Sequence, residues 1–292
     1  MYTLIINPES GQGAAIQNLP AVQAELDARG LEYQVQKAMT ADAATEYARR
    51  ACSENVEGVI AIGGDGTLFQ IVNGMHSDTV PMIFIPCGTG NDFIKSLKLP
   101  TDPVAALKAQ LDAPVSQIDV GRMNEIRFLN VSGTGFDVDV LRNAEKYKKK
   151  HKGLKAYLYA LVDALKTYRP MKAMVSIDDG PEEYAAFAIL SIGNGRYFGG
   201  GMKAVPYAEV ADGLFDVVIV KPVRKFMILP LLVLYIAGKH IAIKLAVLKR
   251  CRRLTIRREG MTINLDGELR NADYACFELL KGALAVRIPQ NN

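Results

Sequence analysis

Three short apolar runs in the first 120 or so residues each end in a turn that carries glycine, and segments with helical spacing separate them. The runs are residues 4–6, 59–62 and 82–85, and the turns after them are residues 7–11, 63–67 and 86–92. This alternation is typical of βαβ units, which build a parallel sheet. Because the loops after parallel strands gather along one edge of the sheet, the three turns are expected to form one ligand site.

The pattern of the chain changes after Gly121. Short and alternating apolar segments broken by glycines then follow, at residues 175–177, 186–190 and 215–219. We therefore predict a doubly wound α/β nucleotide-binding domain over residues 1–121 and a β-rich, antiparallel, sandwich-like domain over residues 122–292. Two helical insertions, over residues 141–168 and 224–237, are expected to interrupt the second domain.

Composition narrows the classes of function. Of the 292 residues, 49% are hydrophobic, which is enough to bury a core in each of two domains. The 35 basic residues exceed the 31 acidic ones too slightly to indicate nucleic acid binding. The four cysteines form no C-x-x-C pair, so neither a zinc site nor a disulfide framework is expected.

The sequence also predicts a cytoplasmic protein without a membrane span. The N-terminus has no basic region and no long apolar stretch of the kind found in secretion signals. The longest apolar run, residues 226–237, would rise only about 18 Å as a helix, against a hydrocarbon core of about 30 Å.

The run Gly63-Gly64-Asp65-Gly66-Thr67 carries the clearest chemistry. Its three glycines allow the backbone to approach a phosphate closely, and exposed N–H groups there can bind phosphate oxygens. No lysine follows the turn as in a Walker motif, and no segment completes G-x-G-x-x-G. The site is therefore expected to belong to another class of nucleotide-binding protein.

This turn, together with Asn7-Pro8-x-Ser10-Gly11 and Gly88-Thr89-x-Asn91-Asp92-Phe93, resembles the catalytic domain of diacylglycerol and sphingosine kinases. The resemblance continues at residues 211–216 and at Asp266-Gly267-Glu268, so it spans nearly the whole chain. It is closest to soluble bacterial lipid kinases, and NAD kinases are related to them. It implies an ATP-dependent kinase that phosphorylates a lipid hydroxyl, with diacylglycerol as the expected substrate and phosphatidic acid as the product.

The resemblance also implies roles for individual residues. Asp65 and Asp92 would organise Mg²⁺, and Lys95 would add a positive charge. Asp266 is the first choice for the base that accepts the proton of the lipid hydroxyl, with Glu268 a close second and Asp65 beside them. The residues implied in nucleotide binding are Asn7, Pro8, Ser10, Gly11, Thr40, Gly63, Gly64, Asp65, Gly66, Thr67, Leu68, Gly88, Thr89, Asn91, Asp92 and Lys95.

A second, structural Mg²⁺ is implied at Asp212, with the backbone carbonyls of Glu209 and Leu214, because oxygen ligands in one tight loop suit a hard cation. Thr40 precedes a predicted helix, so it is interpreted equally as the N-cap of that helix and as a contact to the nucleotide.

The chain departs from the family pattern just after the glycine turn. The family often has asparagine and glutamate there, whereas Leu68 is followed here by Phe69 and Gln70. We expect the loss of that carboxylate to weaken a magnesium-linked contact or to alter the adenine pocket. Two alternatives stay open. One is an NAD kinase, which shares the G-G-D-G-T turn and the overall plan, and the other, motivated by Phe69 and Gln70, is a catalytically silent, membrane-associated nucleotide sensor.

Membrane contact is the remaining expectation. Six lysines, Lys146, Lys148, Lys149, Lys150, Lys152 and Lys155, precede the apolar run of residues 156–162. Lysines near an anionic bilayer contribute about 1 kcal/mol each, so peripheral docking is weighed evenly against a solvated face. Residues 226–237 are interpreted as a buried or interfacial helix rather than a lipid gate. Exposed edge strands would favour a homodimer.

Overall fold

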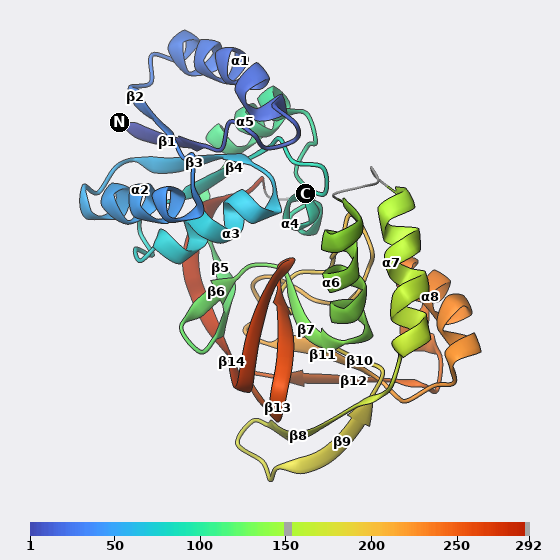
Figure 1. Cartoon of the computed structure of the whole chain (residues 1–292). Coiled ribbons are helices and arrows are strands. Elements are labelled where there is room, and N and C mark those ends of the chain that lie inside the picture. The colour runs from blue at the N-terminus through green and yellow to red at the C-terminus, as the bar shows by residue number, and fades with distance from the viewer. Residues whose placement is uncertain (149–153, 290–292) are drawn as a thin grey trace.

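The first domain is built on four parallel strands (Figure 1), in a computed structural model that describes residues 1–148 and 154–289. The strands are β1 (Tyr2–Ile6), β2 (Tyr33–Lys37), β3 (Gly58–Gly63) and β4 (Met82–Pro86). They lie in the order β4-β3-β1-β2, and each neighbouring pair is parallel. Every residue of β1, β3 and β4 is buried, as expected for a parallel sheet that is covered on both faces.

Helices cover the two faces of this sheet. One face packs against α1 (Ala14–Ala28) and α5 (Pro103–Leu111), and the other packs against α2 (Ala41–Ser53) and α3 (Asp65–Gly74). The short helix α4 (Asp92–Ser96) adds Phe93 to the second of these cores. The predicted doubly wound α/β architecture is confirmed.

The second domain is mainly antiparallel, and its strands continue the same sheet in the order β12 (Ala246–Cys251), β11 (Phe215–Val220), β10 (Ile189–Gly193), β7 (Val131–Gly135), β13 (Arg253–Leu265) and β14 (Glu268–Arg287). Its core gathers apolar side chains from most strands of this domain, among them Phe128, Phe187, Phe215 and Phe277. The predicted β-rich character is confirmed. The other strands of this domain are β5 (Val115–Met123), β6 (Ile126–Phe128), β8 (Met171–Ile177) and β9 (Glu183–Phe187).

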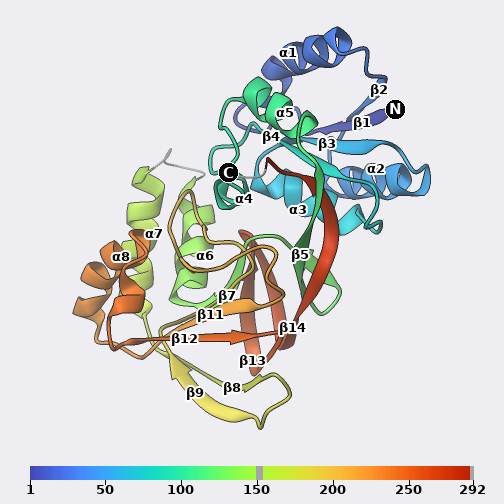
Figure 2. The same cartoon turned by 180° about the vertical axis from the view of Figure 1, so that it is seen from behind.

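The long strand β14 joins the two domains. It pairs with β13 over its first half and with β5 over its second half, and Val286 near its end pairs in parallel with Met82 of β4. Figure 2 shows β14 and β5 side by side, reaching up to the first domain. Leu284 and Val286 are part of the core of the first domain. The predicted division at residue 121 stays a prediction, and β14 contributes to both sides of it.

Helices of the second domain pack together on one side of its strands. They are α6 (Phe136–Lys148), α7 (Leu154–Thr167) and α8 (Ile228–Ile236), with single 3-10 turns at Lys225–Met227 and His240–Ala242. Within the described residues, no helix is both long and apolar enough to cross a bilayer. The predicted insertions are present, but α6 begins at residue 136 rather than 141, because β7 ends at Gly135 with a φ of 125° and Asp137 and Asp139 occupy the first helical turn.

The predicted lysine cluster lies mostly outside the described residues. Lys149, Lys150 and Lys152 are not among them, and neither are the side chains of Lys148 and Lys155.

Candidate active site

The three glycine turns meet at the carboxyl edge of the parallel strands, as the sequence predicts. The hydroxyls of Ser10 and Thr67 share a hydrogen bond of 3.0 Å, which ties the first turn to the second. The turns pack so closely that side chains would not fit. A Cβ on Gly64 would lie 2.8 Å from the Cα of Gly88, and a Cβ on Gly11 would lie 2.0 Å from a backbone oxygen. Close packing between loops therefore requires glycine at these positions.

These turns form a polar cavity of about 440 Å³. The N-termini of α2 and α3 open into it, and the N–H groups of a first helical turn suit a phosphate. Among the described residues, no lysine or arginine lines it, whereas Glu9, Asp65 and Glu268 do. The complete lining is Asn7, Glu9, Ser10, Gly11, Ala38, Met39, Thr40, Ala41, Ala44, Gly64, Asp65, Gly66, Thr67, Gln70, Gly88, Thr89 and Glu268. We call this the nucleotide cavity.

A second cavity of about 350 Å³ lies between the two domains. Asp65 and Thr89 line both this cavity and the nucleotide cavity, so the two share a wall. On the side of the second domain it is lined by Asp266 and by the loop that carries Gly199 and Gly200. We call it the acceptor cavity.

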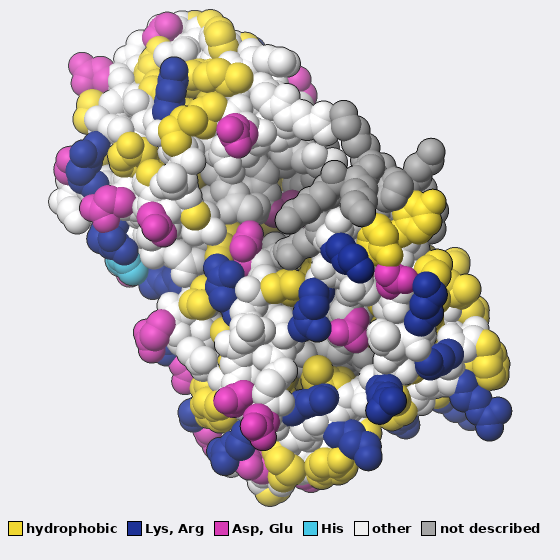
Figure 3. Space-filling view, viewed as in Figure 1, with side chains coloured by type: hydrophobic (Ala, Val, Ile, Leu, Met, Phe, Trp, Pro, Cys, Tyr) yellow, Lys and Arg dark blue, Asp and Glu magenta, His cyan; other side chains and the backbone are white. Residues whose placement is uncertain are grey.

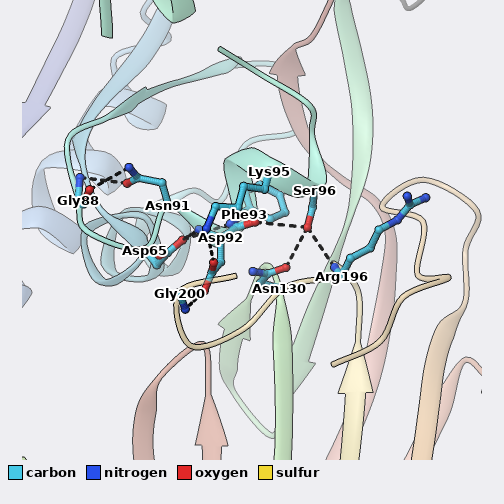
Figure 4. A network of polar contacts seen from close by, with 10 residues as sticks. All are labelled: Asp65, Gly88, Asn91, Asp92, Phe93, Lys95, Ser96, Asn130, Arg196 and Gly200. Carbon is cyan, nitrogen blue, oxygen red and sulfur yellow. Dashed lines mark hydrogen bonds and ion pairs between the residues drawn. The ribbon is translucent and has the colours of Figure 1, made fainter. Parts of the chain in front are cut away.

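Asp65 is held in place at this shared wall (Figure 4). Its Oδ1 accepts the backbone N–H groups of Asp92 at 2.7 Å and Phe93 at 3.2 Å. No hydrogen bond from the described residues reaches its Oδ2. Burial and the nearby carboxylate of Asp92 raise the pKa of Asp65, while the two N–H groups and Lys95 oppose the rise. The free oxygen of Asp65 is therefore available to a cation or to the proton of a substrate.

Asp92 is fully engaged by its neighbours. Its carboxylate pairs with the Lys95 ammonium at 3.0 Å and accepts the Gly200 N–H at 2.7 Å. The second contact fastens the glycine loop of the second domain to α4. The Asp92 carboxylate therefore helps to join the two domains.

A neighbouring network, which the motifs did not indicate, joins the domains further. The Ser96 hydroxyl bonds Asn130 Oδ1 at 3.2 Å and accepts the backbone N–H of Arg196 at 3.0 Å. A Cβ on Gly195 would lie only 1.9 Å from Asn130 Oδ1. The loop that bonds Asp92 through Gly200 could have been found from the sequence, because it carries three consecutive glycines, Gly199, Gly200 and Gly201. Their φ values in the structure are 63°, 90° and 115°.

The turn of Asp266, Gly267 and Glu268 lies between the two cavities. Asp266 and Gly267 line the acceptor cavity, and Glu268 lines the nucleotide cavity. The Asp266 carboxylate accepts three backbone N–H groups, those of Leu129 at 2.6 Å and of Asn130 and Val131 at 2.9 Å each. Burial raises its pKa to about 7, although these N–H groups oppose the rise.

An apolar cavity of about 330 Å³ adjoins the acceptor cavity. Leu141, Phe198 and Gly199 line both cavities, and α6, α7 and α8 supply most of the remaining wall. The one charged residue in the wall is Asp137, whose Oδ1 is enclosed without a hydrogen-bond partner among the described residues. Burial raises the pKa of Asp137 to about 7.

Some of the residues implied in nucleotide binding do not line the nucleotide cavity. Leu68 and Asp92 line the acceptor cavity instead, and Pro8, Gly63 and Lys95 line neither. Asn91 also lines neither, because its amide braces the third turn by bonding both the N–H and the carbonyl of Gly88. Thr40 caps α2 by accepting the Ala43 N–H at 3.2 Å and also lines the cavity.

The departure at Phe69 has a packing explanation. Phe69 is 2% exposed and belongs to the core of the second domain, although it lies on α3. It therefore points away from the nucleotide cavity, which Gln70 lines. The aromatic ring at this position holds α3 against the second domain.

The geometry around Asp212 does not favour a metal there. One oxygen of Asp212 accepts the Leu214 N–H at 3.0 Å, and the other is paired with the Arg250 guanidinium. No group of three or more His, Cys, Asp or Glu side chains placed to hold a metal ion is found in the described part of the chain. The structural Mg²⁺ at Asp212, Glu209 and Leu214 stays a prediction.

A glycine-lined cavity on a doubly wound domain, closed by an antiparallel domain, is the architecture that this chain shares with solved diacylglycerol kinase and NAD kinase structures. The family model described as "Diacylglycerol kinase catalytic domain" matches residues 1–123, and the one described as "YegS C-terminal NAD kinase beta sandwich-like domain" matches residues 130–288. The chain belongs to this diacylglycerol kinase and YegS-like family of lipid kinases.

Individual relatives agree with this assignment. The chain is 29% identical to a diacylglycerol kinase of Mycobacterium tuberculosis, over 94% of this chain and 89% of the relative. It is 33% identical to a "Probable lipid kinase YegS-like" of Pseudomonas fluorescens, over 93% and 91% of the two chains. A crystal structure of a "putative diacylglycerol kinase" from Bacillus anthracis superimposes with a TM-score of 0.80 at 26% identity, covering 98% of this chain and 96% of that one.

An NAD kinase from Archaeoglobus fulgidus, solved in complex with ATP, shares the fold alone, with a TM-score of 0.56 at 13% identity over 99% of this chain and 94% of that one.

Proposed function

We propose that the protein transfers the γ-phosphate of ATP to the hydroxyl of a membrane lipid, with diacylglycerol as the expected acceptor. One observation carries the proposal. Asp65 and Thr89 form a common wall between a polar cavity at helix N-termini and a cavity that continues into an apolar one. Phosphate and lipid would therefore meet at Asp65.

The nucleotide cavity fits a phosphate chain that arrives with a divalent cation. N–H groups in the first turns of α2 and α3 would bind phosphate oxygens. The cavity offers carboxylates rather than basic side chains among its described residues, so a bare polyphosphate would be repelled. Asp65 and Glu268 are the residues that would hold Mg²⁺, which, when bound, neutralises charge on the phosphoryl group during transfer.

The acceptor cavity positions a base. Asp266 is fixed by three N–H groups at the start of β7, and it faces the same space as Asp65. Its carboxylate would accept the proton of the lipid hydroxyl, and a pKa near 7 suits that role at neutral pH. Glu268 is the weaker candidate, because it lies on the nucleotide side.

The apolar cavity favours a lipid over a dinucleotide. A soluble polar acceptor such as NAD would leave a lining of Leu, Ile, Val, Met and Phe side chains without a partner, whereas an acyl chain would fill it. The silent-sensor alternative rests on the departure at Phe69 and Gln70. Against it, both Asp65 and Asp266 line the acceptor cavity, so a carboxylate for the cation and one for the base would be at hand.

The test is transfer of labelled γ-phosphate from ATP to mixed micelles that contain diacylglycerol, sphingosine, ceramide or phosphatidylglycerol, with NAD in a separate reaction. We expect label in one lipid, reduced by about 100-fold or more in Asp266→Asn. Asp78→Asn, an exposed carboxylate outside the three cavities, serves as the matched control. Label in NAD alone would make the protein an NAD kinase, and ATP binding without transfer to any acceptor would make it a nucleotide sensor.

A further inference from the structure

Helix α8 is apolar on all its sides, yet only its inner side is covered. Its sequence is ILPLLVLYI, without a charged residue. Ile228 and Tyr235 are buried against α7 and the strands below, and Leu232, Tyr235 and Ile236 line the apolar cavity. A helix with this composition is normally buried on every side.

The outer side of α8 forms an exposed apolar stripe. Phe226 in the preceding turn, Leu229, Val233 and Ile236 are 71%, 51%, 66% and 47% exposed, and their spacing of three and four residues places them on one face. Val162 on the adjacent α7 is 51% exposed as well. Figure 3 shows apolar side chains in yellow along the right-hand edge, where Figure 1 places α7 and α8. Single exposed apolar residues are ordinary, but a continuous stripe marks an interaction site.

The surroundings of this stripe are strongly basic. Residues 217–258 contain eleven Lys and Arg residues and no Asp or Glu. Five of the basic residues lie next to α8 in sequence and are exposed, and none forms an ion pair with a described residue: Lys221, Arg224, Lys225, Lys239 and Lys244. Among the described residues, the one side-chain hydrogen bond from this set runs from Lys225 Nζ to the Lys166 carbonyl, which carries no charge to compensate the ammonium. Figure 3 shows dark-blue side chains below and beside the yellow edge.

We propose that α8 is a membrane-docking helix, whose stripe enters the boundary between headgroups and acyl chains of an anionic bilayer. The proposal rests on the proposed lipid kinase function. An apolar helix face bordered by lysine and arginine has the composition of interfacial helices, and the cations add electrostatic attraction to anionic headgroups. A second copy of the chain would suit this surface less, because a two-fold contact would bring both sets of uncompensated cations together.

Docking in this orientation explains why α8 is apolar on two sides. Ile236 belongs both to the exposed stripe and to the wall of the apolar cavity. The bilayer and the cavity are then separated by the thickness of one helix. A lipid would enter the cavity beside α8 without exposing its acyl chains to water.

Co-sedimentation with vesicles tests the proposal. The probe is phosphatidylcholine vesicles with and without phosphatidylglycerol, and the variant is the double substitution Phe226→Ser and Val233→Ser. We expect the parent to bind the anionic vesicles. The affinity of the variant for these vesicles should be lower by a factor of about ten or more. Removing charge, with Arg224→Gln and Lys239→Gln, is expected to weaken binding to anionic vesicles and not to neutral ones. The matched control is Tyr184→Ser with Tyr207→Ser, which removes two aromatic rings that are 65% and 63% exposed.

Two further measurements separate docking from folding and from catalysis. All variants should keep the thermal unfolding midpoint of the parent, since the substituted residues are exposed. Phosphorylation of a short-chain diacylglycerol in detergent should be unchanged in the α8 variant, while phosphorylation of long-chain lipid in vesicles falls. Equal vesicle binding by the variant and the parent would overturn the proposal. So would a parent dimer that the α8 variant dissociates without loss of vesicle binding. A parent that binds vesicles through α8 but phosphorylates no lipid would instead refute the kinase function.

Discussion

Oδ1 of Asp65 accepts the backbone N–H of Asp92 at 2.7 Å, across the gap between the second glycine turn and the start of α4. The bond uses one oxygen of Asp65 and leaves the other facing the cavities. An asparagine could keep the bond through its carbonyl oxygen but would lose the charge. We expect Asp65→Asn to reduce phosphoryl transfer by about 100-fold or more. Its unfolding midpoint should stay within a few degrees of the parent, because the substitution also removes the repulsion by Asp92. A variant with parental turnover would exclude Asp65 from the reaction.

The close contact between Gly64 and Gly88 predicts that alanine destabilises the protein at position 64 but not at position 66. In Gly64→Ala the new Cβ would press on the backbone of Gly88, and we expect a loss of about 1–3 kcal/mol in the free energy of unfolding, together with weaker ATP binding. Gly66→Ala is the control, because nothing lies within 4 Å of its Cβ and alanine favours a helix. Urea unfolding of the two variants should give shifts of opposite sign, or a shift in Gly64→Ala alone.

The apolar cavity should select for chain length. Leu232→Phe adds volume to its wall, so we expect kcat/KM for a long-chain diacylglycerol to fall about tenfold or more. The value for a dioctanoyl lipid should change little, since a short chain leaves room for the ring. Equal losses for both substrates would indicate that the acyl chains bind elsewhere.

Asp137 should make stability depend on pH. Its pKa is raised by burial to about 7 from an ordinary value of 3.8, so the folded protein keeps a proton that the unfolded chain releases. Its contribution to stability is full below about pH 4 and is lost as the pH rises through 7. Relative to Asp137→Asn, the parent should lose about 4 kcal/mol in the free energy of unfolding between pH 4 and pH 8. Parallel pH profiles of the two proteins would show that the carboxyl is ionised in the folded state.

Removal of divalent cations should weaken ATP binding rather than leave it unchanged. Glu9, Asp65 and Glu268 line the nucleotide cavity, so bare ATP meets three carboxylates there. We expect a chelator to reduce ATP affinity by about tenfold and abolish transfer, and Mg²⁺ to restore both. In calorimetry, Glu268→Gln should bind bare ATP more tightly than the parent. If the parent bound ATP more tightly with the chelator than with Mg²⁺, the three carboxylates could not lie next to the bound phosphates.

The sequence was informative where local motifs determine the structure. The turns at residues 7–11, 63–67 and 86–92 each follow a buried strand, and parallel-sheet geometry alone predicts that they meet. That Asp65 and Asp266 would line one cavity, although they are far apart in the sequence, could be predicted only from the family resemblance. The assignment of Glu268 to one cavity and Asp266 to the other needed the structure, since both lie in one short turn.

The roles of single polar residues were harder to predict, because they depend on contacts between distant segments. Asn91 belongs to a motif that implied nucleotide binding, yet its amide is used up by Gly88. From the sequence, Phe69 departs from the family pattern at a position expected near the nucleotide. In the structure its ring is buried in the core of the second domain. Ser96 and Asn130 stand in no motif, and their hydrogen bond joins segments 34 residues apart in sequence.

The pairing of Val286 with Met82 has a consequence for how the chain is made. The core of the first domain includes Leu284 and Val286, so a nascent chain cannot complete that core until residues 284–286 have left the ribosome. A fragment ending near residue 123 would keep the glycine turns and expose an open strand edge at β4, which invites aggregation. Synthesis of residues 284–286 is thus the step that turns a partly formed first domain into a finished one.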